Sequence, residues 1–93
     1  MRLSQKVALV TSSRRGVCAS TARLLAQAGA SVMICGRNAT QGQATVTEIQ
    51  SSGGRASFIL ADIASATDVQ AAIDETIATY GRLDILFNCA SSP

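Results

Sequence analysis

Apolar residues follow two alternating patterns along the chain. Three long stretches in which apolar residues recur every three or four positions lie between short, continuous apolar runs. The short runs are typical of buried strands and the long stretches of amphipathic helices. The four predicted strands are "KVALVT", "SVMIC", residues 56–60 and "LDILFN". The pattern therefore predicts strands and helices in strict alternation, beginning and ending with a strand.

The predicted helices carry end signals. They cover residues 17–28, 40–51 and 66–80, and a glycine follows each of them within two residues. Glycine after the last turn is a common way for a helix to end. Ser65 and Asp68 have the spacing of a capping box at the start of the third helix. Gly42 lies in the first turn of the second helix and lowers its helix propensity.

Continuous apolar strands separated by helices are typical of a parallel sheet with helices on both faces. We therefore expect an α/β fold, the first part of a Rossmann-type doubly wound sheet. No repeat, low-complexity tract or linker divides residues 1–93 into smaller units, so we expect no second domain. In such sheets ligands bind at the carboxyl ends of the strands. The segments expected there are "TSSRRGVC", "CGRN", "ADIA" and "NCAS".

Charge is distributed unevenly. The chain has 93 residues, 47% of them hydrophobic and 15% charged, with a formal net charge of +2. Six of the eight basic residues precede Glu48, the first acidic residue. We expect any anion-binding surface to lie in this first half. Nucleic-acid binding is disfavoured, because the arginines are not interleaved with aromatic residues and no helix carries a basic stripe.

The chain has no predicted export or membrane signal. The first apolar run is four residues long, too short for a signal peptide, and no run approaches a membrane span. Three cysteines without disulfide spacing suggest the reducing cytoplasm. Cys18, Cys35 and Cys89 all fall at the expected carboxyl edge, where a redox or metal role competes with simple packing. We favour packing and expect no metal site, because the chain has no histidine.

In their order and spacing these segments resemble the short-chain dehydrogenase/reductases. The matching features are Thr11-x-x-x-x-Gly16-Val17 after the first strand, "CGRN", Asp62-Ile63 and "GRLDILFNCA". The resemblance implies the strand order 3-2-1-4, a nicotinamide dinucleotide cofactor and hydride transfer to or from carbonyl or alcohol substrates. It also places a catalytic serine and a Tyr-x-x-x-Lys pair beyond residue 93. On this basis the chain alone is predicted to be inactive, and oligomer formation would need the further segment.

The first loop departs from the family pattern Thr-Gly-x-x-x-Gly-x-Gly. Ser12 and Cys18 stand where two of its three glycines would be, and only Gly16 is retained. Those glycines allow a tight turn and a close approach of backbone to the pyrophosphate. A Cys18 side chain would crowd the helix end that meets the phosphates. The loop is thus either a weakened phosphate cradle or an ordinary turn capped by a serine.

The second loop bears on the choice of nucleotide. NAD sites carry an acidic residue about 20 residues beyond the glycine turn, whereas a 2′-phosphate needs a positive partner. This chain has Gly36 and Arg37 in that region and no carboxylate nearby. Arg37 with Arg14 or Arg15 could form a guanidinium clamp for the phosphate, which favours NADP(H) over NAD(H). The alternative is that these arginines are simply solvated.

The third and fourth loops supply the remaining candidates. The resemblance implies that Asp62 and the backbone of Ile63 contact adenine, and a turn or capping role for Asp62 is the alternative. Asn88 and Ala90 match the family pattern Asn-Asn-Ala-Gly. The candidate cofactor-binding residues are Thr11, Ser12, Arg14, Arg15, Gly16, Val17, Arg37, Asp62, Ile63, Asn88 and Ala90.

Together these features predict a partial NADP(H)-binding Rossmann domain spanning residues 1–93. The predicted function is the amino-terminal part of an NADP(H)-dependent oxidoreductase. A truncated or decayed chain with weak or no nucleotide binding is the alternative, because two loop glycines are replaced. The fourth strand should be an edge strand that is apolar on both faces, and so prone to association.

Overall fold

The structure is a computed structural model that describes residues 3–11, 16–62 and 64–88. Its elements are β1 (Val7–Thr11), α1 (Gly16–Gln27), β2 (Ser31–Gly36), α2 (Ala39–Ser51), β3 (Arg55–Leu60), α3 (Ala66–Tyr80) and β4 (Ile85–Asn88). Each predicted strand and helix is present, and most boundaries agree within a residue. The fourth strand is the exception, because it begins two residues later than predicted.

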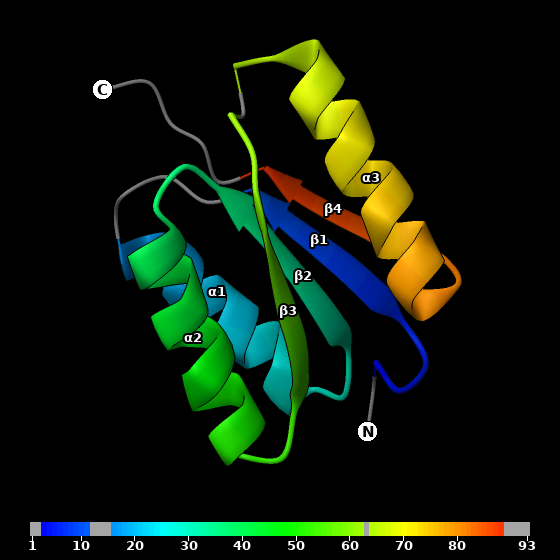
Figure 1. Ribbon diagram of the computed structural model, residues 1–93. Helices are drawn as coiled ribbons and strands as arrows, with labels where there is room; N and C mark the ends of the chain where they lie inside the picture. The colour runs from blue at the N-terminus through cyan, green and yellow to red at the C-terminus, as the bar shows by residue number, and fades with distance from the viewer. Residues whose placement is uncertain (1–2, 12–15, 63, 89–93) are drawn as a thin grey trace.

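All strand pairs in the described sheet are parallel, and the order is β3-β2-β1-β4. This confirms the predicted Rossmann-type topology. Figure 1 shows α1 and α2 against one face of the sheet and α3 against the other. The strands therefore need apolar side chains on both sides, which explains why their sequences read as continuous apolar runs.

The core consists of two layers, one on each face of the sheet. The layer beneath α1 and α2 contains Val10, Ala22, Ala26, Ala30, Val32, Ile34, Val46, Ile49 and Ala56. The layer beneath α3 contains Leu9, Met33, Cys35, Ala61 and Ala72. Every residue of β1 and β2 is buried, so these two central strands contribute side chains to both layers.

Helix α2 begins at a side-chain cap and packs closely on β3. The Gln41 backbone N–H donates to Oδ1 of Asn38 at 3.0 Å, which satisfies one of the first amide groups of the helix. A Cβ atom added to Gly42 would collide with the ring of Phe58. Gly42 therefore lowers helix propensity but is required for the close contact between α2 and β3.

Helix α3 is capped at both ends. The Asp68 N–H donates to Oγ of Ser65 at 3.2 Å, as the capping-box spacing predicts. The Asp68 carboxylate instead accepts from the backbone N–H of Asp62 at 2.8 Å, and thereby joins the helix to the end of β3. Gly81, with φ of 89°, ends the helix in the left-handed conformation. Within the described part of the chain, no helix has the length and apolarity needed to cross a membrane.

Strand β4 lies at the edge of the four-stranded sheet that the described residues form, and it pairs with β1. Leu86 and Phe87 are 53% and 39% exposed and are the register partners of Leu9 and Val10, which belong to different core layers. The two exposed side chains therefore project from opposite faces of β4. This confirms the predicted edge strand with two apolar faces.

Candidate functional site

The carboxyl ends of the four strands meet at one edge of the sheet (Figure 1). The parallel register places Thr11 beside both Cys35 and Asn88, and places Gly36 beside Leu60. The segments that follow these strands carry the residues selected from the sequence. This edge is therefore the candidate functional site, as the topology of the fold leads one to expect.

Two of the selected residues contact each other directly. The hydroxyl of Thr11 donates to Oδ1 of Asn88 at 2.9 Å across the register pair that ends the β1/β4 ladder. Thr11 is only 5% exposed whereas Asn88 is exposed, so the bond is partly buried. It joins the last residue of β1 to the last residue of β4. The sequence indicated both residues but not the bond between them.

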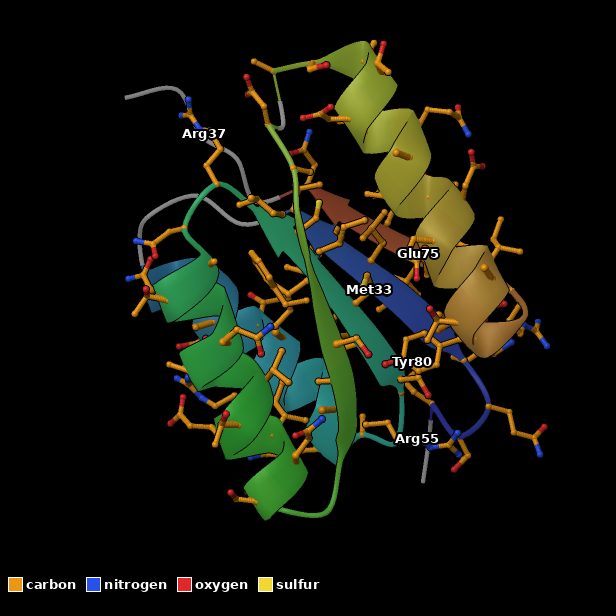
Figure 2. All side chains as sticks on the ribbon, in the orientation of Figure 1. Met33, Arg37, Arg55, Glu75 and Tyr80 are labelled. Carbon is orange, nitrogen blue, oxygen red and sulfur yellow. The ribbon has the colours of Figure 1, made fainter. Side chains whose placement is uncertain are left out.

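Arg37 lies between two anchored residues. The carbonyl of Gly36 accepts from the Ala61 N–H at 2.8 Å, and the Asn38 side chain caps α2. The Arg37 side chain is exposed and extends from the carboxyl edge, at the opposite end of the sheet from Arg55 (Figure 2). The ion pairs found among the described residues are Arg23–Glu48 and Arg82–Asp84, so Arg37 has no carboxylate partner there.

Asp62 organises the turn that leads into α3. Its Oδ1 accepts from the Ala64 N–H at 3.0 Å, and its carbonyl accepts from the Ser65 N–H at 2.9 Å. These contacts are those of an aspartate-stabilised turn, the alternative weighed from the sequence. The adenine contact implied by the family resemblance stays a prediction.

The first loop is only partly covered by the structure. Gly16 and Val17 form the first turn of α1, and the helix begins just after β1, at the carboxyl edge. The positive end of the helix dipole therefore lies at the candidate site. Five of the selected residues lie outside the described residues: Ser12, Arg14, Arg15, Ile63 and Ala90.

Cys35 is a packing residue. It is fully buried at the end of β2, and burial raises the pKa of its thiol to about 11. The thiol is therefore protonated at neutral pH and is neither a ready nucleophile nor a metal ligand. The side chain of Cys18 and the whole of Cys89 lie outside the described part of the structure. Among the described residues, no cluster of three potential metal ligands occurs.

Asp84 is a structural residue that the sequence analysis missed. Its Oδ2 accepts from the Val7 N–H at 2.8 Å, and its own N–H donates to the Val7 carbonyl at 2.9 Å. Arg82 donates to Oδ1 through Nε at 3.0 Å and through Nη2 at 2.7 Å. The Arg82 and Val7 bonds lower the pKa of the Asp84 carboxyl below its ordinary value.

These bonds also explain the late start of the fourth strand. The Val7 N–H donates to the Asp84 side chain and not to a strand carbonyl, so the regular β1/β4 ladder begins only at Ile85. The prediction of a strand from Leu83 was wrong for this reason. The available signal was an acidic residue directly before a short apolar run.

Comparison with known proteins agrees with this arrangement. A family model described as "short chain dehydrogenase" matches residues 6–92. The chain belongs to the short-chain dehydrogenase family. Members of this family bind a nicotinamide dinucleotide.

The similarity extends over nearly the whole chain. Tropinone reductase-like 1 of Erythroxylum coca is 43% identical over 96% of this chain and 32% of its own length. A crystal structure of hydroxysteroid dehydrogenase from Escherichia coli matches with a TM-score of 0.92 and 37% identity, over 98% of this chain and 39% of that one. A metagenomic short-chain oxidoreductase in complex with NADP matches with a TM-score of 0.85 and 34% identity, over 92% and 39%.

This short-chain dehydrogenase sequence is much shorter than its relatives. It spans about a third of the length of the curated relatives that it matches. The relatives therefore contain further sequence of about twice this length.

Proposed function

We propose that the chain is the dinucleotide-binding part of an NADP(H)-dependent oxidoreductase acting on carbonyl or alcohol substrates. The observation that carries the proposal is the exposed Arg37, directly after β2, without a carboxylate partner among the described residues. An NAD-binding site of this fold has a carboxylate in this region for the ribose hydroxyls. A guanidinium group there suits a 2′-phosphate instead, because it can donate two parallel hydrogen bonds.

The surroundings of Arg37 support this role. Hydrogen bonds of Gly36 and Asn38 hold the backbone on either side of Arg37, so the position of its Cα atom is fixed. The Asn38 amide oxygen is occupied by its bond to the Gln41 N–H. Of the residues in this turn, Arg37 is the one whose charged side chain is exposed and can contact a phosphate. One structural neighbour was solved in complex with NADP, which is compatible with the same preference here.

The residues of this chain fit binding better than catalysis. In the direction of carbonyl reduction the cofactor would supply the hydride, and the reaction would also need a proton donor close to the substrate. Tyr80, the only tyrosine, lies at the other end of the sheet, where its hydroxyl is 2.8 Å from Oγ of Ser57. Lys6, the only lysine, directly precedes β1 at that same end. We therefore propose that these 93 residues bind the cofactor and leave proton transfer to a further segment.

The test is a thermal-shift titration of the 93-residue chain with NADPH and with NADH. We expect a larger increase in Tm with NADPH, because only this nucleotide carries the 2′-phosphate. Arg37→Gln should remove the difference between the two nucleotides. Arg55→Gln is the matched control, since Arg55 is also exposed but lies at the amino end of β3.

Two results would overturn parts of this proposal. Equal shifts with NADPH and NADH in the unmodified chain would remove the argument from Arg37. No shift with either nucleotide would favour the decayed chain, in which Ser12 and Cys18 have replaced two glycines of the phosphate-binding loop.

A further inference from the structure

Strand β3 forms one edge of the described sheet and is paired with β2 on its inner side. The Ala61 N–H donates to the Gly36 carbonyl at the end of this ladder, so the residue after β3 faces β2. Backbone groups of successive residues point alternately to the two sides of a strand. The N–H and C=O groups of Ala56, Phe58 and Leu60 therefore point away from β2, where they could pair with a further strand.

This edge has few of the features that usually prevent strand addition. Natural edge strands are protected by proline, by charged side chains, by bulges or by a covering element. The sequence of β3 is RASFIL, in which Arg55 is the only charged residue and proline is absent. Its six register pairs with β2 are consecutive, so β3 has no bulge. Leu60 adds an apolar side chain that is 65% exposed. Protection of this edge must therefore come from elsewhere in the chain.

Helix α2 supplies a side chain to this edge. The Gln50 side-chain amide donates through Nε2 to the Ala56 carbonyl at 3.2 Å, and this bond is partly buried. Gly53, with φ of 89°, and Gly54 lie in the turn between α2 and β3. A Cβ atom on Gly54 would lie 2.7 Å from Cγ2 of Ile49, so the turn is tight. It brings the last turn of α2 beside the start of β3 and places Gln50 within reach of an outward carbonyl.

A second copy of this chain fits the open edge in an antiparallel arrangement. The outward residues are spaced symmetrically about Phe58, so a two-fold axis at Phe58 pairs Ala56 of each copy with Leu60 of the other. Every outward N–H and C=O group then has a partner. The exposed Leu60 side chain would lie on the same face as Ala56 of the other copy and lose contact with water. The two Arg55 residues would lie about 20 Å apart along the strands, beyond the Debye length of about 8 Å, so their charge does not prevent the pairing.

We infer that Gln50 blocks the addition of β3 from a second copy of this chain at this edge. Its amide occupies the Ala56 carbonyl, which would otherwise accept from the Leu60 N–H of the incoming strand. By two-fold symmetry the block acts twice, once in each chain. This role does not depend on the proposed nucleotide binding, because it concerns the outer edge of β3 and not the carboxyl ends of the strands.

Sedimentation velocity of the 93-residue chain at a series of concentrations tests the block. Gln50→Met keeps the length of the side chain but removes its N–H donor. We expect it to tighten homodimer formation at least about tenfold, because two hydrogen bonds per dimer become available. Gln43→Met makes the same change at another exposed glutamine of α2 and should associate as the unmodified chain does. Association through other surfaces is common to all three proteins and cancels in the comparison.

Amide hydrogen exchange shows where the Gln50→Met chains meet. The outward amides of Phe58 and Leu60 should exchange at least about tenfold more slowly at concentrations above the dimer Kd than far below it. The amides of Leu86 and Asn88 in β4 should show no such dependence on concentration. Adding Leu60→Pro to Gln50→Met removes an outward N–H and no bond to β2. The double variant should return to the association of the unmodified chain.

The outcomes distinguish a block from a bond that only stabilises a turn. Equal association of Gln50→Met and Gln43→Met would overturn the block, and a loss of stability without a change in association would show that Gln50 only holds the turn between α2 and β3. Stronger association with slowed exchange in β4, or with unchanged exchange at Phe58 and Leu60, would overturn the pairing through β3. A dimer that persists after Leu60→Pro would overturn it as well.

Discussion

The two ends of the sheet differ in what their side chains do. At the amino end, side chains make bonds between elements: the Tyr80 hydroxyl bonds to Oγ of Ser57 and joins α3 to β3, and the Asp84 carboxylate, directly before β4, accepts from the Val7 N–H of β1. At the carboxyl end one side-chain bond, Thr11–Asn88, joins β1 to β4, and Gly36 and Asn38 hold the backbone on either side of Arg37, whose side chain extends outward (Figure 2). The comparison indicates that the amino end mainly provides stability. The carboxyl end presents groups that can contact a ligand, as in other sheets of this type.

The largest effect on stability is expected at Gly42, which lies near the carboxyl end but has a packing role. Gly42→Ala should reduce the free energy of unfolding by about 1–3 kcal/mol, because the new methyl group meets the Phe58 ring. Chemical denaturation measures this loss. Gln43→Ala, an exposed change in the same turn, should alter stability by less than about 0.5 kcal/mol. A Gly42→Ala variant as stable as this control would contradict the close packing of α2 on β3.

A smaller effect is expected from the tyrosine at the amino end. Tyr80→Phe removes the hydroxyl that bonds to Ser57 and should lower the free energy of unfolding by about 1 kcal/mol. It should leave the Kd for NADPH unchanged, because the hydroxyl lies at the far end of the sheet. Denaturation and nucleotide titration of the same sample check both parts. A weakened affinity with unchanged stability would reverse the assignment of the two ends.

The stabilising contribution of Asp84 should depend on pH in a defined direction. Its folded-state pKa lies below the ordinary value of 3.8, so its contribution is complete above that value and is lost as the pH falls through the folded-state pKa. The stability difference between the unmodified chain and Asp84→Asn should therefore be constant near neutral pH and shrink below about pH 4. Denaturant unfolding at several pH values measures this difference. A difference that grows on acidification would contradict the cause assigned to the lowered pKa.

The smallest effect is expected from Arg37 in the absence of ligand. Its side chain is exposed and has no ion-pair partner among the described residues. Arg37→Gln should therefore change the free energy of unfolding by less than about 0.5 kcal/mol. A clear loss of stability in ligand-free denaturation would show that Arg37 holds the fold, and its role as a ligand contact would lose support.

The sequence predicts the architecture well because the architecture depends on repeated local patterns. The apolar runs and helical spacing give all seven elements, and the resemblance to a family gives the strand order. The bonds of Asp84 and Tyr80 could not be predicted, because the first joins residues 77 positions apart along the chain and the second joins residues 23 positions apart. Such contacts depend on register and side-chain direction, which no local pattern contains. From the sequence, Gly42 only lowers the helix propensity of α2. Its packing role could not be predicted, because its partner Phe58 lies on β3.

The candidate site is predictable only in part. The topology places Thr11, Arg37, Asp62 and Asn88 at one edge, as the sequence indicates. The turn made by Asp62 and the bond between Thr11 and Asn88 are details of geometry that residue types alone do not determine. The choice between NADP(H) and NAD(H) rests on the charge of one exposed side chain.

Chemical-shift mapping of the amide signals during titration with NADPH tests the central claim most directly. The account predicts the largest changes at Arg37, Ala61 and Asn88, at the carboxyl end of the sheet. It predicts small changes at Arg55 and Tyr80, at the amino end. Changes concentrated around Arg55 and Tyr80, or no changes at saturating NADPH, would contradict the assignment of the carboxyl end as a nucleotide-binding site.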